Sequence, residues 1–185
     1  MKFTLPMLVG LCLVMLACDS AKEKTPEEQQ MMAVQDESAV RNMLTNLHAD
    51  LQRVYGGSVG EVDSLYALYF VPDMYYVTPW GTSETLDSTI ARLKTSIPHI
   101  SNYENSIENL FVSIHGEGGY GRYVLRQTYV VDGFEVEDYL PTTVAVERVN
   151  GQWKIVHLQR STDMKGFQQL MNLQEYLAKQ SRQKR

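Results

Sequence analysis

The sequence is poor in cysteine and has no excess of positive charge, and both shortages exclude classes of protein. Its 185 residues contain two cysteines, Cys12 and Cys18, too few for a disulfide framework or a thiolate metal site. With 17 basic and 22 acidic residues, the formal net charge is −5. A mildly acidic chain lacks the electrostatic footprint of a nucleic-acid-binding protein, so we expect no nucleic-acid partner.

Several catalytic motifs are also missing. The histidines at 48, 99 and 115 show no spacing typical of zinc ligands. The glycine-rich stretch 116–121 lies between predicted strands and opens no helix, so it is not a phosphate-binding loop. The chain has no Gly-x-Ser-x-Gly nucleophile motif. We therefore expect neither a metal ion nor a cofactor.

Long apolar runs are scarce too, and the longest lies near the N-terminus. Leu5 to Leu16 follows Lys2 and is shorter than the ~20 residues that a spanning helix needs. It leads into Met15-Leu16-Ala17-Cys18. Charged, apolar and small-residue regions in this order are typical of a secretory signal.

The position of Cys18 directly after Ala17 resembles the lipobox of bacterial lipoproteins, with Met15 where leucine is usual. The resemblance implies cleavage before Cys18, diacylglycerol on its sulfur and an acyl group on its new amino terminus. Membrane lipid would then hold the protein in the cell envelope, in the periplasm or facing the exterior. An ordinary cleaved signal or an uncleaved anchor is the alternative.

Composition divides the chain into four segments. Residues 1–17 are the expected lipoprotein signal peptide. Residues 18–35 are rich in Glu, Lys and Gln without an aromatic residue, which predicts a flexible tether. Residues 36–162 are the expected globular domain. Residues 163–185 are expected to form a C-terminal helix and a basic tail.

The first half of the domain shows helical spacing. Apolar residues predict a long helix from Val40 to Tyr55, ended by Gly56 and Gly57, and a shorter helix from Val62 to Tyr69. A short strand is expected at 74–78. A third helix is expected at 86–97, ended by proline.

From about residue 103 to 161 the pattern is that of strands. Glycine-rich turn signals at 116–119, Asp132-Gly133 and Asn150-Gly151 separate four β-rich runs, and the short connections predict an antiparallel meander. Helices followed by such a sheet predict an α+β fold with the helices on one face. A curved sheet under a long helix leaves a conical cavity, the default ligand site of an uncharacterised protein.

The segment 143–161 contains Gly151-Gln152-Trp153, then Ile155-Val156-His157, and ends in Ser161. This order resembles the last hairpin of the SnoaL-like group in the nuclear transport factor 2-like superfamily. Residues 68–77 are similar to that group's helix-to-strand junction, and residues from about 38 to 162 match its element order. The resemblance implies a cone-shaped fold. It gives no single reaction, because the superfamily includes polyketide cyclases, ketosteroid isomerases, dehydratases and a kinase association domain.

Alternation on the last strand would put Trp153, Ile155, His157, Gln159 and Ser161 on one face. The resemblance implies that this face lines the cavity, with Gln159 where a second histidine is expected. We therefore expect Trp153, His157 and Gln159 at the ligand site. His157 would be either a catalytic base or a structural histidine.

Other candidates come from neighbouring elements. Tyr76 and Trp80 are expected either at the cavity mouth or as core or dimer contacts. Asp73 is either a general base or a turn residue. The preceding strands offer polar and aromatic candidates, namely Arg126, Gln127, Tyr129, Asp138 and Tyr139. Arg126 facing the pocket would favour an acidic ligand, because a buried arginine needs an anionic partner. A shift of register by one residue would instead place it on the solvated face.

Three functions remain open from the sequence. A binding module would hold a small apolar or amphipathic molecule in the cavity. An isomerase, cyclase or dehydratase would move a proton next to a carbonyl, with His157 or Asp73 as base. A dimeric scaffold would pair through an apolar patch on the outer face of the sheet.

Overall fold

The structure is a computed structural model that describes residues 25–183; the predicted signal peptide and Cys18 lie outside the described residues. The elements, in chain order, are α1 (Pro26–Tyr55), η1 (Val59–Glu61), α2 (Val62–Tyr69), β1 (Phe70–Val77), β2 (Ser83–Thr85), α3 (Leu86–Ser96), η2 (Ile97–His99), β3 (Ile100–His115), β4 (Gly118–Val131), β5 (Phe134–Val149), β6 (Gln152–Arg160) and α4 (Met164–Gln183). No helix within this range is long and apolar enough to cross a membrane.

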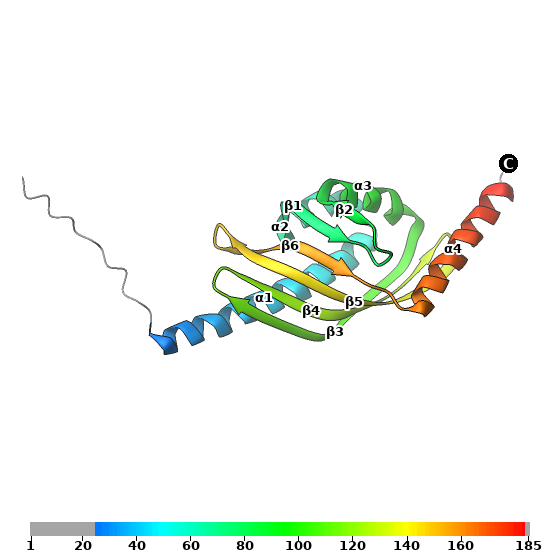
Figure 1. Ribbon diagram of the computed structural model, residues 1–185. Helices are drawn as coiled ribbons and strands as arrows, with labels where there is room; N and C mark the ends of the chain where they lie inside the picture. Colours follow the sequence, from blue (N-terminus) through cyan, green and yellow to red (C-terminus); the bar gives the residue numbers. More distant parts are fainter. Residues whose placement is uncertain (1–24, 184–185) are drawn as a thin grey trace, which may run out of the picture.

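The strands form one curved sheet with the order β2-β1-β6-β5-β4-β3 (Figure 1). Strands β3 to β6 make the expected antiparallel meander. The two hairpin dipeptides, Asp132-Gly133 and Asn150-Gly151, have positive φ at both residues, as tight hairpin turns require. The expectation of a wholly antiparallel sheet is corrected, because β1 pairs with β6 in parallel. Strand β2, α3, η2 and strands β3 to β5 all lie between β1 and β6 in the chain, so this pairing joins segments far apart in the sequence.

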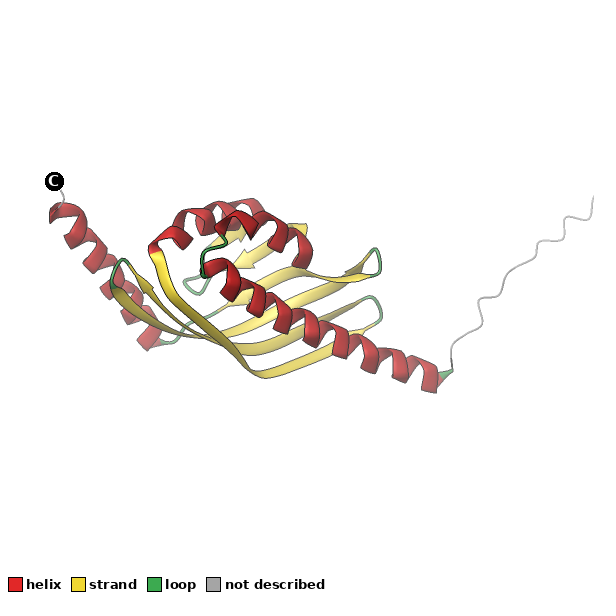
Figure 2. Cartoon of the chain, turned by 180° about the vertical axis from the view of Figure 1, so that it is seen from behind, coloured by secondary structure: helices red, strands yellow, loops and turns green. Residues whose placement is uncertain are grey.

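Helix α1 crosses one face of the sheet, with α2 and α3 beside it, and α4 lies at one end of the molecule (Figure 2). This arrangement confirms the α+β fold with helices covering a curved sheet. One face of α1 is apolar at helical spacing, and its buried Leu44 and Leu47 belong to the same core as Val112, Val144 and Ile155 of the sheet.

Helix α1 begins ten residues before the predicted domain boundary at residue 36. Thr25 and Glu28 form a capping box: the Thr25 hydroxyl accepts from the Glu28 amide at 3.2 Å, and the Glu28 carboxylate accepts from the Thr25 amide at 2.8 Å. Pro26 occupies the first turn, where its missing N–H costs nothing. Residues 26–35, predicted as flexible tether, are therefore helical, whereas residues 18–24 of that segment lie outside the described range.

A β-bulge in β6 decides which side chains face the helices. Val146 pairs with Ile155, but its neighbour Ala145 pairs with His157, so Val156 is an extra residue. Before the bulge the buried positions are odd-numbered, and after it Leu158 is buried instead. The prediction that His157 and Gln159 share the inner face with Trp153 is therefore wrong, since it assumed unbroken alternation.

Candidate functional site

The space between the sheet and the helices contains a cavity of about 440 Å³. Its walls come from the C-terminal half of α1, from α2, α3 and α4, and from the inner face of the sheet. Helix α4 contributes Leu170, Leu173 and Leu177, which lie on one helical face. A volume of this size is typical of small-molecule sites.

Tyrosines make up much of the wall. Six line the cavity: Tyr55, Tyr66, Tyr76, Tyr103, Tyr123 and Tyr129. Burial raises the pKa of all of these except Tyr76, for which no shift is resolved. The five buried hydroxyls therefore stay neutral and can donate hydrogen bonds, while their rings offer flat apolar surface.

Arg160, at the end of β6, places a cation in this wall. Its guanidinium carbon lies 5.9 Å from the centre of the Tyr76 ring. Its Nε is buried and has no hydrogen-bond partner within residues 25–183. Burial acts to lower the pKa of Arg160, but the tyrosine oxygens around it, led by Tyr76 and Tyr123, outweigh that effect and raise the pKa. The side chain is therefore positively charged.

A carboxylate faces the same cavity from β5. Asp138 accepts a hydrogen bond from Gln127 Nε2 at 2.8 Å and another from the Tyr129 hydroxyl at 3.0 Å. The Gln127 amide oxygen in turn accepts from the Tyr103 hydroxyl at 3.2 Å. These hydrogen bonds hold the carboxylate in place.

His48 supports the cavity wall from behind. Its Nε2 lies 2.9 Å from the Tyr123 hydroxyl, and the two rings meet edge to face with centroids 5.2 Å apart. Burial, with a smaller effect of the nearby charge of Arg160, lowers the pKa of His48 to about 3. The imidazole is therefore neutral at ordinary pH and holds the Tyr123 hydroxyl in position.

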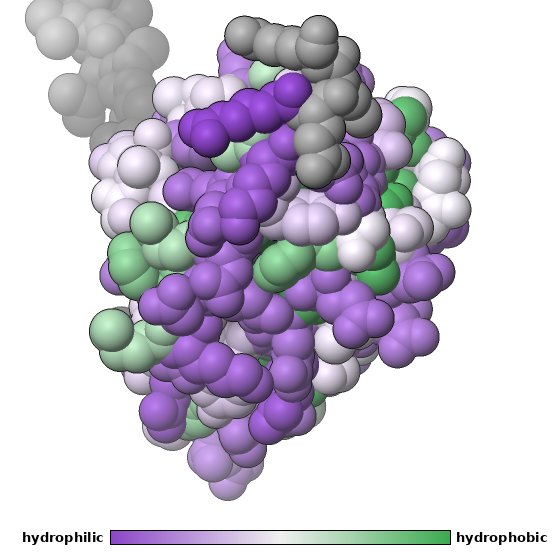
Figure 3. Space-filling view, turned by 90° about the vertical axis from the view of Figure 1, so that its right-hand side faces the viewer, coloured by the Kyte–Doolittle hydropathy of each residue, from purple (hydrophilic) through white to green (hydrophobic). Residues whose placement is uncertain are grey.

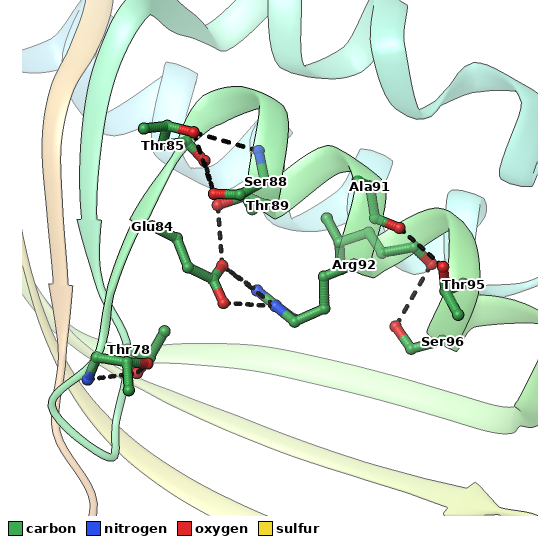
Figure 4. Close-up of polar contacts among 11 residues, drawn as sticks. Thr78, Glu84, Thr85, Ser88, Thr89, Ala91, Arg92, Thr95 and Ser96 are labelled. Atoms are coloured by element: carbon green, nitrogen blue, oxygen red, sulfur yellow. Dashed lines mark hydrogen bonds and ion pairs between the residues drawn. The ribbon is translucent and has the colours of Figure 1, made fainter.

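Arg92 of α3 also lines the cavity, but its charge is already matched (Figure 4). Its Nε lies 2.9 Å from Glu84 Oε1 and its NH2 nitrogen 2.9 Å from Oε2, a bidentate pair. Thr89 donates a further hydrogen bond to the same carboxylate at 3.0 Å. Burial alone would lower the pKa of Arg92, yet Glu84 more than compensates and raises it.

Two of the predicted ligand residues, Tyr76 and Trp80, line the cavity. Tyr76 of β1 lines the cavity and is almost fully buried. Trp80, in the turn between β1 and β2, lines it as well and is half exposed. Among the further strand candidates, Gln127, Tyr129 and Asp138 meet in the cavity through the hydrogen bonds described above.

The other predicted residues lie elsewhere. His157 stacks on Tyr75 on the outer face of the sheet, with ring centroids 5.9 Å apart. Gln159 lies outside the cavity on that same face, because the bulge reverses the alternation. Asp73 is exposed and lies outside the lining. Neither candidate base therefore reaches the cavity.

Arg126, Tyr139 and Trp153 are also absent from the cavity wall. The Arg126 guanidinium pairs with Glu108 at 2.7 Å and stacks over the Tyr139 ring at 5.2 Å, both on the outer face. Trp153 faces inward but lies in the core, with the Arg148 guanidinium 4.7 Å from its ring centre. The alternative of a solvated Arg126 is the one that the structure supports.

Sequence reasoning missed Arg160, and a signal for it does exist. Trp153 and Ile155 are apolar at odd positions, whereas Leu158 is apolar at an even one. Such a change of phase within one strand indicates a bulge, which puts Arg160 on the inner face.

The chain matches no protein-family model and no curated protein. Solved structures do match its architecture. A protein with a cystatin-like fold from Novosphingobium aromaticivorans, described as NTF2-like, is 12% identical, with a TM-score of 0.59 over 81% of this chain and 98% of that one. The fold is nuclear transport factor 2-like.

Other proteins with the nuclear transport factor 2-like fold carry enzyme names. A candidate scytalone dehydratase from Novosphingobium aromaticivorans is 18% identical, with a TM-score of 0.60 over 73% of this chain and 89% of that one. A candidate dehydratase from Streptomyces avermitilis is 14% identical, with a TM-score of 0.60 over 71% and 98%. At these identities the likeness shows the fold alone.

Proposed function

We propose that this nuclear transport factor 2-like domain binds a small, largely apolar molecule in its cavity. The observation that carries the proposal is the 440 Å³ hollow, which the protein's own side chains leave unfilled. Its walls combine leucines with tyrosine rings, so they would remove much of the surface of an apolar molecule from water. The half-exposed Trp80 at the rim suits an entrance through which such a molecule passes.

A neutral fluorescent probe tests this proposal. We expect N-phenyl-1-naphthylamine to bind the protein saturably with one molecule per chain. Leu51→Trp, which fills the cavity from α1, should weaken binding by at least about tenfold, since overpacked apolar sites reject added volume. The matched control is Leu68→Trp, on the exposed face of α2, which should bind as the wild type does. Equal binding by both variants would contradict the proposal.

A second candidate function is an enzyme of the dehydratase kind. It is favoured by Asp138, a fixed carboxylate that faces the same cavity as Arg160 and Tyr129. A carboxylate can remove a proton next to a carbonyl while a cation or hydroxyl stabilises the oxyanion that forms. Two of the structural neighbours have dehydratase names, which suits the same reaction class.

The enzyme function is tested with a panel of β-hydroxy carbonyl compounds, following the loss of water by absorbance. We expect Asp138→Asn to lower turnover at least about 100-fold, because it removes the base. Binding of the neutral probe should persist in this variant. A wild-type protein that binds the probe but turns over no compound would leave only the binding function.

We also propose that the domain is attached to a bacterial membrane through an acylated Cys18, which lies outside the described residues. The support is the Met15-Leu16-Ala17-Cys18 sequence after an apolar run. In bacteria fed an alkyne fatty acid, the protein should take up the label and sediment with membranes. Cys18→Ser should lose both properties, whereas Cys12→Ser should keep them. Labelling of Cys18→Ser would refute this attachment.

The expected homodimer stays a prediction. The outer face of the sheet carries exposed aromatic side chains, including Tyr75, Tyr120 and Tyr139, which would suit pairing of two subunits. A strictly monomeric mass in light scattering would count against it.

A further inference from the structure

We propose that the ligand carries one acidic group, a carboxylate, which binds the guanidinium of Arg160 inside the cavity. This inference rests on the proposed ligand-binding function and names the chemical class of the ligand. The ligand is accordingly an apolar monocarboxylic acid.

The first step is that two other charged groups of the wall are already paired. Arg92 is held by both oxygens of Glu84. His99 Nδ1 lies 3.2 Å from Asp132 Oδ1 at the end of the cavity. The Arg92–Glu84 pair has no net charge, and Asp132 is partly exposed, so water and His99 are its partners.

The second step concerns the two charges that remain, Asp138 and Arg160. Asp138 accepts hydrogen bonds from Gln127 and Tyr129, so its charge is stabilised by the protein. Arg160 has no carboxylate within ion-pairing distance among residues 25–183, and its buried Nε lacks a hydrogen-bond acceptor. Neither charge has an oppositely charged partner within the described residues, but only the Arg160 cation keeps a buried atom, its Nε, without a hydrogen-bond partner.

The third step is energetic. A buried cation without a counter-ion has lost its hydration, and the face of the Tyr76 ring replaces only part of it. An anion that reaches the guanidinium gains a charge-assisted hydrogen bond in a site of low dielectric, where such bonds are strongest. The Tyr123 hydroxyl, which contacts His48 Nε2 and also hydrogen-bonds Arg160, lies in the same wall and helps to orient the guanidinium.

The fourth step selects a singly charged carboxylate. The planar fork of a guanidinium matches the two oxygens of a carboxylate. A dianion such as a phosphate monoester would bring two charges to one cation while the Asp138 carboxylate faces the same space. The leucines of α4 and the tyrosine rings then surround an apolar remainder.

Matched pairs of acid and alcohol test the inference by isothermal titration calorimetry. The pairs are 1-naphthylacetic acid with 2-(1-naphthyl)ethanol and decanoic acid with 1-decanol. In the wild type at neutral pH we expect the acid of at least one pair to bind roughly 10- to 100-fold more tightly than its alcohol. Arg160→Gln should abolish this preference, because it weakens binding of the acid far more than binding of the alcohol. Arg126→Gln, on the outer face, should retain it.

The outcomes separate the two proposals. If the alcohols and the neutral naphthylamine probe bind but no acid binds more tightly, the acidic-group inference is overturned and the binding function stands. If neither those probes nor any acid binds, both fall. The wild-type ratio of acid to alcohol decides the question even where Arg160→Gln does not fold.

Discussion

Burial affects two basic side chains near Tyr123 differently: His48 becomes neutral, whereas Arg160 remains positively charged. His48 has lost its water and takes up a proton only at a pKa of about 3, so it is neutral in the folded protein. Arg160 stays charged, because even strong desolvation cannot deprotonate a guanidinium near neutral pH. One residue thus acts as a fixed hydrogen-bond partner and the other as a permanent cation.

The depressed pKa of His48 makes stability depend on pH. The unfolded chain titrates near the ordinary value of 6.5 and the folded one near 3, so between these values the unfolded state binds more protons. Stability therefore falls as the pH drops through this window. Between pH 7 and 5 we expect His48 to account for about 2 kcal/mol of lost unfolding free energy. Urea unfolding at both pH values measures it.

The comparison variant is His48→Gln, which removes the titration and can still hydrogen-bond Tyr123. It should lose about 2 kcal/mol less than the wild type over the same interval. His157→Gln, on the outer face, should follow the wild type. Parallel slopes for all three proteins would show that His48 does not carry this dependence.

At the scale of elements, the sequence predicts the helices and hairpins well and strand β6 badly. Helical spacing and the Asp-Gly and Asn-Gly turns are local signals, so α2, α3 and the meander could be anticipated. A bulge depends on pairing with another strand and is not a local signal. Because strict alternation was assumed, His157 was predicted on the wrong face and Arg160 was not predicted at the cavity. The pairing of β1 with β6 is equally non-local. The expected fold predicted a cavity, but the sequence did not show that Arg92 and Arg160 line it.

The close approach of β3 and β4 leaves no room for a side chain at Gly119. A Cβ added to Gly119 would lie 2.5 Å from the Ser113 carbonyl oxygen and 3.1 Å from the Ile114 Cα, so the backbone would have to move. We expect Gly119→Ala to lower the unfolding free energy by about 1–3 kcal/mol. Urea denaturation of the variant and the wild type measures the difference.

The adjacent Gly118 provides the control for this prediction. A Cβ there meets only the Val146 carbonyl oxygen, at 3.6 Å, an ordinary contact. Gly118→Ala should therefore change stability by no more than about 0.5 kcal/mol. Equal losses in both variants would mean that strand propensity, not the clash, is responsible.

At the scale of the whole molecule, α4 closes one end of the cavity. Its Tyr176 hydroxyl donates to the Asp132 carbonyl at 3.1 Å, and its Lys165 pairs with Glu137 at 3.2 Å, which fixes it to the β4–β5 hairpin. Seen from this end, the surface is largely hydrophilic with scattered hydrophobic groups (Figure 3). The leucines of α4 face the cavity, whereas Met171 on the same helix is exposed to solvent.

Substitutions on the two sides of α4 should have different effects on ligand binding. Leu173→Ser removes apolar wall from the cavity and should weaken binding of N-phenyl-1-naphthylamine by about fivefold. Met171→Ser places the same residue on the exposed side and should bind the probe as the wild type does. Fluorescence titration measures both. The proposed role of α4 would be refuted by identical affinities.

The N-terminal end of helix α1 lies far from the cavity that its C-terminal half lines. The first side chain of α1 in the wall is Leu47, so the helix from Pro26 onward forms a rigid spacer of roughly 30 Å. A lipid held at Cys18 would thus be joined to the far end of this spacer. If the domain is attached through Cys18 as proposed, the length of this spacer would let the cavity lie up to about 30 Å from the membrane surface and open to the aqueous phase.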